Sequence, residues 1–276
     1  MKTVKTRDGT ELAVKDWGQG RPVVMLHGWP LSADTFDGLS MALASQGWRA
    51  VSYDRRGFGR SGQPWSGYDY DTLADDLATV LETLDLRQVT LLGFSMGGGE
   101  VVRYLSRHGR GRVAQAVLMA SVVPCMLKTV GNPDGVDAEV FEQMIEGLGT
   151  DRAKFYEGFF KEFYGVGLLS RPVSQGVIDW SVRLVMQAGL KPAIACVEAF
   201  SRTDFRGDLA SVTVPTLVVH GSDDQIVPVQ TGGRAAAARI PGARLVEIPG
   251  APHGLLASHP DEVRSAVIDF LREVTA

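Results

Sequence analysis

Short runs of apolar and β-branched residues alternate with stretches of helical periodicity, and this alternation constrains the fold of the chain more than any other feature. Each run has the length of a buried strand. Between two of them, residues 71–86 place Leu73, Leu77 and Leu84 on one helical face. Strands alternating with helices predict an α/β fold, in which helices cover both faces of a mostly parallel sheet. The predicted buried strands are residues 22–27, 49–53, 89–93, 114–120, 216–220 and 244–248.

The first twenty residues predict a different start to the sheet. Strand-like segments lie around Val4 and over residues 11–16, and Asp8-Gly9 separates them. An Asp-Gly pair between two such segments is a hairpin signal, so these strands are expected to be antiparallel. The sheet is therefore predicted to be mixed, with about eight strands.

Residues 124–210 interrupt the alternation. Strand-like runs vanish there, and helical stretches rich in Phe, Met and Leu replace them. We interpret this segment as a helical cap inserted into one α/β core formed by residues 1–123 and 211–276. A single core is usual for α/β chains of this length.

The charged residues exclude several classes of partner. The chain has 28 Lys and Arg against 32 Asp and Glu, a net charge of -4, and its basic residues are scattered. Nucleic acids and anionic membranes require a basic cluster, so neither is expected as a partner. The charged N-terminus and the absence of an 18-residue apolar run favour a cytoplasmic location. Cys125 and Cys196 lack the spacing of a metal site, so no metal is expected and both are predicted to be buried free thiols.

The strongest local motif is Gly93-Phe94-Ser95-Met96-Gly97, which follows a predicted strand and precedes a predicted helix. A serine exposed on such a sharp turn needs small neighbours because the chain passes close to it. The motif therefore predicts Ser95 as a nucleophile.

A serine hydroxyl becomes a good nucleophile only when a neighbouring base takes its proton. Among the five histidines, His253 lies in a loop of small residues directly after the last predicted strand. His259 is the alternative, although its place beside the final helix favours a capping or solvated role. His27 and His220 end strands, where imidazoles often hold loops, and His108 ends the helix after Ser95.

A carboxylate is needed to hold the base in the right tautomer. The segment His220-Gly221-Ser222-Asp223-Asp224 follows the penultimate strand and offers two adjacent acids. Asp224 is preferred because it precedes an apolar turn, and Asp223 remains the alternative. The chain order Ser, Asp, His then matches that of known hydrolases with strand–turn–helix nucleophiles.

The charge that develops on a substrate carbonyl oxygen needs backbone N–H donors. One is expected from Met96, the residue after the nucleophile, and the other from Trp29, in the loop after an early strand. Pro30 restricts the backbone of Trp29. All these candidates follow predicted strands, at the sheet edge where open α/β sheets bind ligands.

Residues 57–62 fit the pattern G-x-G-x-x-G of dinucleotide-binding turns. That turn must open directly into a helix, whereas Pro64 and Gly67 continue this segment as a loop. No nicotinamide cofactor is therefore expected.

Together the strings HGWP, YDRRGFGRS, GFSMGGG, HGSDDQIVP and GAPHG resemble the cofactor-free haloperoxidase and aryl esterase branch of the α/β-hydrolases over nearly the whole chain. The resemblance implies an α/β-hydrolase fold, no cofactor, and a triad at Ser95, Asp224 and His253. It also implies hydrolysis of small esters, and peracid formation from peroxide and a carboxylic acid. In family terms, Pro30 and the Trp29 carbonyl fit members that form peracids well.

The cap is expected to decide substrate choice. Its aromatic residues and the residues near the triad are candidates for an apolar acyl pocket, although aromatic residues at helical spacing also simply pack on a core. Lactonase, amidase or lactamase, and carbon–carbon bond hydrolase activities are alternatives on the same triad, and a small-molecule receptor is the non-enzymatic one. A homo-oligomer is possible. The pocket candidates are Trp29, Phe159, Phe160, Phe163, Ile226 and Val227.

Overall fold

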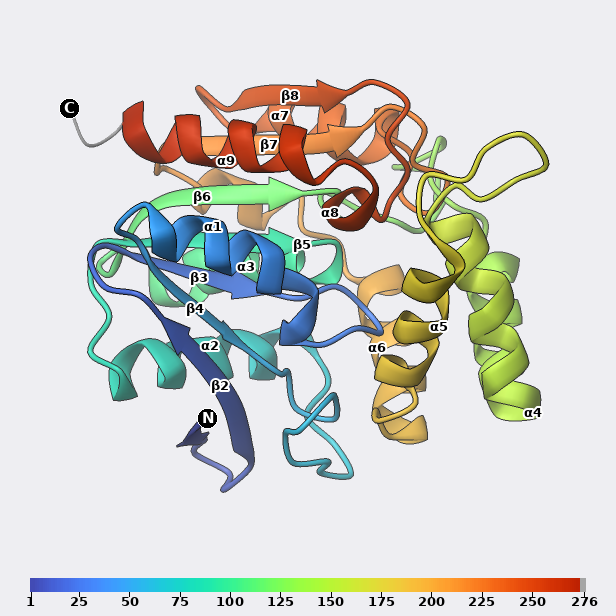
Figure 1. Ribbon diagram of the computed structural model, residues 1–276, viewed down its shortest axis with the longest axis horizontal. Coiled ribbons are helices and arrows are strands. Elements are labelled where there is room, and N and C mark those ends of the chain that lie inside the picture. Colours follow the sequence, from blue (N-terminus) through green and yellow to red (C-terminus); the bar gives the residue numbers. More distant parts are fainter. Residues whose placement is uncertain (274–276) are drawn as a thin grey trace.

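The computed structural model describes residues 1–273, which contain one eight-stranded sheet in the order β1-β2-β4-β3-β5-β6-β7-β8 (Figure 1). Strand β2 pairs antiparallel with β1 and β4, and the other pairs are parallel. The predicted mixed sheet with an antiparallel start is confirmed. The strands are β1 (Lys2–Lys5), β2 (Glu11–Trp17), β3 (Pro22–Leu26), β4 (Arg49–Tyr53), β5 (Val89–Phe94), β6 (Val113–Met119), β7 (Thr216–Gly221) and β8 (Arg244–Ile248).

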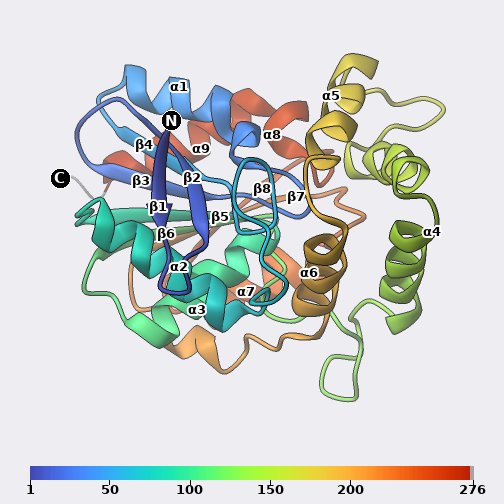
Figure 2. The same cartoon turned by 90° about the horizontal axis from the view of Figure 1, so that it is seen from below.

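Helices cover both faces of the sheet, as the alternating pattern predicts. Helices α1 (Asp37–Ser45) and α9 (Pro260–Glu273) lie on one face, and α2 (Tyr70–Thr83), α3 (Met96–His108) and α7 (Ala235–Arg239) lie on the other (Figure 2). Every residue of β3 and β5 is consequently buried. The short elements are η1 (Ala33–Phe36), η2 (Asp208–Ser211), η3 (Gln230–Arg234) and α8 (Leu255–Ser258).

Three helices between β6 and β7 stand beside the carboxyl ends of the parallel strands (Figure 1). They are α4 (Ala138–Phe163), α5 (Gln175–Val185) and α6 (Leu190–Arg202). Helix α4 is interrupted at Asp151, whose φ of -149° and ψ of 87° are not helical. We call residues 138–150 its first arm and residues 152–163 its second arm.

Residues 124–137 differ from the helical expectation. They form no helix, and isolated bridges join Leu127 to Val136 and Cys125 to Asp204. The side-chain amide of Asn132 donates to the carbonyls of Cys125 and Leu127, which closes a turn. Turn-forming residues around Asn132 explain why this part of the insertion is not helical.

The register of β3 and β5 brings two loops together. Leu26 near the end of β3 is the partner of Gly93 near the end of β5, so the segments after these strands leave the sheet side by side. No helix within residues 1–273 is long and apolar enough to cross a membrane. Cys125 and Cys196 are buried free thiols, as expected.

Candidate active site

Ser95 lies at the sharp turn between β5 and α3. Its φ of 54° and ψ of -118° fall in a region that costs a non-glycine residue about 1–3 kcal/mol. Its N–H donates to the carbonyl of Met119 on β6 at 2.8 Å, which holds the turn in place. A Cβ atom at Gly97 would lie 2.2 Å from the backbone oxygen of Leu26. The turn therefore needs glycine at this position, which accounts for the motif.

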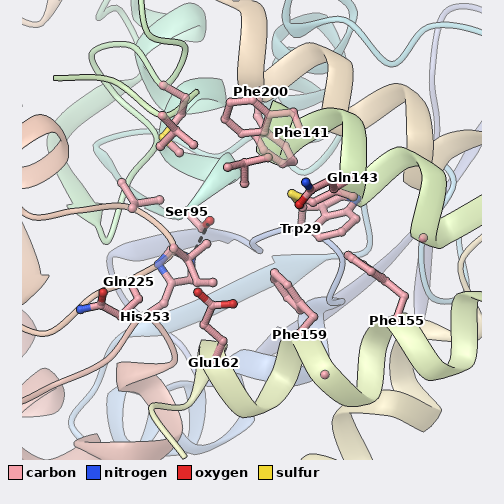
Figure 3. Close-up of a pocket in the computed structure, with 18 of the residues that line it drawn as sticks. Trp29, Ser95, Phe141, Gln143, Phe155, Phe159, Glu162, Phe200, Gln225 and His253 are labelled. Carbon is pink, nitrogen blue, oxygen red and sulfur yellow. Dashed lines mark hydrogen bonds between the residues drawn. The ribbon is translucent and has the colours of Figure 1, made fainter. Parts of the chain in front are cut away.

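His253 joins Ser95 to Asp224. Its Nε2 lies 2.9 Å from the hydroxyl oxygen of Ser95, and its Nδ1 lies 2.7 Å from Oδ2 of Asp224 (Figure 3 draws the first contact). A carboxylate can only accept a hydrogen bond, so Nδ1 carries the proton of the neutral ring. Nε2 is then free to accept the hydroxyl proton of Ser95. All three side chains are buried.

The surroundings of Asp224 favour its ionised form. Oδ1 accepts from the N–H groups of Ile226 and Val227 at 2.9 and 2.8 Å. Burial alone raises the pKa of this carboxyl, but its electrostatic interaction with His253 and the hydrogen bonds from His220 and His253 outweigh the effect of burial. The pKa of Asp224 is held well below its usual value, so the carboxylate is available to His253 around neutral pH.

His220 also contacts Asp224, and the sequence did not predict this contact. Its Nε2 lies 2.8 Å from the carbonyl of Val227, which fits the predicted loop-holding role, and also 3.2 Å from Oδ2 of Asp224. The available signal was its place four residues before Asp224, at the end of β7. His220 therefore holds both the loop and the carboxylate.

The alternative candidates lie elsewhere. Asp223 is exposed, and one of its carboxylate oxygens accepts from the hydroxyl of Ser222. Nδ1 of His259 lies 2.9 Å from the hydroxyl oxygen of Ser258. His108 lies 2.7 Å from Asp75 on α2. The geometry thus joins Ser95 to His253 and Asp224.

The loop after β3 packs directly against Ser95. A Cβ atom at Gly28 would lie 2.9 Å from the Cβ atom of Ser95. Trp29 is next in this loop, and Met96 begins α3, where a backbone N–H has no partner within the helix. Both predicted N–H donors therefore belong to segments that adjoin Ser95.

A buried polar network holds this loop. Nε2 of His27 accepts from the backbone N–H of Arg55 at 2.9 Å, so its Nδ1 carries the proton and donates to the carbonyl of Gly28 at 2.9 Å. Burial, helped by the charge of Arg55, lowers the pKa of His27 well below its usual value and keeps the ring neutral. Nε of Arg55 in turn donates to Glu100 on α3 at 2.6 Å.

Ser95 opens into a cavity of about 900 Å³ between the sheet edge and α4 (Figure 3). Among the predicted pocket residues, Trp29, Phe159, Ile226 and Val227 line it, and Phe160 and Phe163 do not. Phe163 lies one turn beyond Phe159, where its ring packs edge-on against His253 with centroids 5.0 Å apart. The indole N–H of Trp29 donates to the carbonyl of Ala193 on α6 at 2.9 Å, which fixes the ring that lines the cavity.

The cavity has further walls that the sequence analysis did not single out. Those on α4 follow helical spacing in the sequence, but which face of α4 meets the cavity depends on its bend at Asp151. Among residues 1–273 no group of three or more His, Cys, Asp or Glu could hold a metal ion. The additional apolar residues are Val122, Met126, Val136, Val140, Phe141, Met144, Phe155 and Phe200, and the polar ones include Gln143, Thr150, Asp151, Lys154, Glu162 and Gln225.

Known proteins are similar to this chain over their full length. Residues 21–260 match the family model described as the α/β-hydrolase fold. The chain is 46% identical to a non-heme chloroperoxidase of Kitasatospora aureofaciens, over 99% of this chain and 100% of that protein. It is 39% identical to a bifunctional esterase/perhydrolase of Acinetobacter calcoaceticus, over the same shares.

One solved structure is also similar to this chain over nearly its whole length. The bromoperoxidase from Bacillus anthracis superposes with a TM-score of 0.96 at 40% identity, over 98% of this chain and 99% of that chain. The superposition thus spans nearly the whole chain. The chain therefore belongs to the α/β-hydrolase fold family, in the group that contains the non-heme haloperoxidases.

Proposed function

We propose that this protein hydrolyses small carboxylic esters through an acyl-enzyme formed on Ser95. The observation that carries the proposal is the hydrogen-bonded chain from Ser95 through His253 to Asp224, at the end of a largely apolar cavity. A base in contact with a strained serine is the arrangement that activates a hydroxyl for acyl transfer. The similarity to an esterase/perhydrolase supports the same chemistry.

In the first half of the cycle, Nε2 of His253 takes the proton of Ser95 as Oγ attacks the ester carbonyl carbon. The N–H groups of Trp29 and Met96 donate to the oxygen that becomes negative. The tetrahedral intermediate collapses, the alcohol leaves with the proton held by His253, and the acyl group stays on Ser95. Asp224 stabilises the positive charge that His253 carries between these steps.

In the second half, water loses a proton to His253 and attacks the acyl carbon, which releases the acid and restores Ser95. Hydrogen peroxide in place of water gives a peracid by the same step. The peracid then transfers its terminal OH to the halide as the O–O bond breaks, which gives hypohalous acid and leaves the carboxylate. We propose this perhydrolase activity as a secondary one, supported by the haloperoxidase and perhydrolase relatives.

The residues around Ser95 and the inserted segment have further roles. Trp29, Phe159, Ile226 and Val227 bind the apolar part of the ester. Residues 124–210 act as a cap on a core of residues 1–123 and 211–276, and substrate choice lies in the cap. A cytoplasmic location and a homo-oligomer stay predictions.

The test compares wild type, Ser95→Ala and, as a control, Ser45→Ala, which removes an exposed hydroxyl on α1. We expect Ser95→Ala to lower kcat for p-nitrophenyl acetate on the order of 10⁴-fold and Ser45→Ala to leave it unchanged. Bromination of monochlorodimedone in acetate and peroxide should depend on Ser95 in the same way. Retention by Ser95→Ala of more than about a tenth of the activity would overturn the assignment.

The alternatives give different results. Labelling of Ser95 by a fluorophosphonate without hydrolysis of any ester would favour a lactone, a lactam or a carbon–carbon bond as the substrate. A serine that also resists the fluorophosphonate would favour a small-molecule receptor.

A further inference from the structure

Both arms of α4 line the cavity beside Ser95. Its lining residues are adjacent or two to three positions apart along each arm, so one face of each arm borders it. In Figure 3 the labelled residues of the two arms lie on opposite sides of the space that leads away from Ser95. The first arm contributes Val140, Phe141, Gln143, Met144, Gly147 and Thr150, and the second contributes Lys154, Phe155, Gly158, Phe159 and Glu162.

Aromatic rings form much of the cavity wall: the ring of Trp29 lies 5.4 Å from that of Phe159 and 5.8 Å from that of Phe200, centroid to centroid. Polar side chains line both ends, with Glu162 and Gln225 beside His253 (Figure 3) and Asp151 and Lys154 at the bend. The helical rise from Phe159 back to Asp151 spans about 12 Å. An acetyl group occupies only the first part of this length.

Gly158 on the second arm leaves part of the cavity open. A glycine inside a helix is destabilising relative to alanine, so it calls for a reason. At Gly147 the reason is packing, because a Cβ atom there would lie 2.7 Å from the ring of Phe155. Gly158 is an exposed residue that lines the cavity, and a Cβ atom there would meet nothing within 4 Å. Packing of α4 therefore does not account for this glycine, and its missing side chain leaves space at the border of the cavity.

We propose that the channel between the two arms of α4 binds an apolar chain of medium length on the ester, and that Gly158 determines how long that chain can be. This inference rests on the proposed esterase function and names its substrate class. Aromatic walls favour an apolar chain because its burial removes apolar surface from water.

The test measures kcat/KM for methyl acetate, methyl hexanoate and methyl octanoate, and for hexyl and octyl acetate. Gly158→Leu fills the channel. Gly149→Leu is the matched control, because Gly149, like Gly158, is an exposed glycine of α4 where a Cβ atom meets nothing within 4 Å, but it does not line the cavity. Gly158→Ala adds only a methyl group, and alanine has a higher helix propensity than glycine. This variant therefore tests the same position even if Gly158→Leu does not fold.

In the wild type we expect kcat/KM to rise up to about fourfold for each methylene buried, in one of the two ester series. Gly158→Leu should lower the ratio of the C8 ester to methyl acetate at least about tenfold, Gly158→Ala should lower it less, and Gly149→Leu should keep the wild-type ratio. A response in the methyl ester series would show that the channel binds the acyl chain. A response in the alkyl acetate series would show that it binds the alcohol chain.

A flat chain-length profile in the wild type would overturn the inference, as would an unchanged ratio in Gly158→Leu. Either result leaves the proposed function standing, because the short esters are still hydrolysed through Ser95. Absence of Ser95-dependent hydrolysis of every ester, methyl acetate included, would instead refute the proposed function.

Discussion

Asp223 and Asp224 are neighbours in the chain with the same functional group, and their surroundings give them different roles. Asp224 is 3% exposed and surrounded by two backbone N–H groups and two imidazoles. Asp223 is exposed, and its carboxylate accepts from the hydroxyl of Ser222. A carboxylate that is buried, ionised and hydrogen-bonded can orient an imidazole, whereas an exposed one is screened by water.

We therefore expect Asp224→Asn to lower kcat for ester hydrolysis on the order of 10⁴-fold, because an amide no longer favours the tautomer of His253 with its proton on Nδ1. Asp223→Asn is the matched control, and its kcat should stay close to that of the wild type. Steady-state kinetics on p-nitrophenyl acetate decide the point. A comparable loss in Asp223→Asn would contradict the distinction between the two acids.

At the level of elements, one carboxylate ties the antiparallel strands to the rest of the sheet. Asp16 on β2 accepts from Nε and Nη2 of Arg49 on β4, at 2.8 Å each, and from Nζ of Lys2 on β1 at 2.6 Å. The hydrogen bonds from Arg49 outweigh the effect of burial and lower the pKa of Asp16 to about 2. Strands β1, β2 and β4 thus share one charged contact at the edge of the sheet.

The Asp16→Asn variant should lower the free energy of unfolding by about 1 kcal/mol at pH 7, with no change in the active site. Because the pKa of Asp16 is lower in the folded state than in the unfolded state, its contribution is fully present above about pH 4. It is lost as the pH falls toward the folded value of about 2. Urea denaturation along a pH series should therefore show the difference from wild type shrinking below pH 4.

Asp134→Asn serves as the control for that series, because Asp134 is exposed in the loop before α4. This variant should unfold like the wild type at every pH. A deficit in Asp16→Asn that stays constant down to pH 2 would show that the ion pairs do not stabilise this edge.

In the whole molecule, the two layers of helices and the three inserted helices leave little of the interior open to solvent. Cys196 on α6 is 0% exposed and Cys125 is 6% exposed. Burial raises the pKa of the Cys196 thiol to about 12 and also raises the pKa of Cys125. Only the thiolate is nucleophilic, so both groups should be inert while the protein is folded.

We expect the native protein at pH 8 to react with dithiobis(nitrobenzoate) only as fast as it unfolds, and to release two equivalents of thiolate per chain in guanidinium chloride. The denatured sample is the internal control for thiol content. Rapid reaction of one thiol in the native state would contradict the packing of α6 or of the loop that carries Cys125.

Much of the fold and of the site could be predicted from the sequence, for local reasons. Gly97 is required wherever a serine turns this sharply between strand and helix, so the turn around Ser95 is visible in the sequence itself. His253 and Asp224 each follow a predicted strand, and the carboxyl ends of neighbouring parallel strands meet at one edge. The predicted strands and the shared edge of a parallel sheet were therefore enough to predict that Ser95, His253 and Asp224 lie close together.

Other features depended on contacts between distant segments. The choice of Asp224 over Asp223 is decided by which carboxylate the loop after β7 turns toward His253. The contact of His220 with Asp224 depends on that same loop. The difference between Phe159, which lines the cavity, and Phe163, which packs on His253, arises where α4 ends beside the loop after β8.

The sequence by itself determined the order of strands and helices, the strained serine and the chain positions of its partners, because each depends on residues close in sequence. Only the tertiary structure decided the shape of the cavity. The bend at Asp151 sets the two arms of α4 around Trp29, and helical spacing alone does not say which face of each arm turns inward. A side chain becomes part of a binding site through what packs against it, and that is a property of the folded chain.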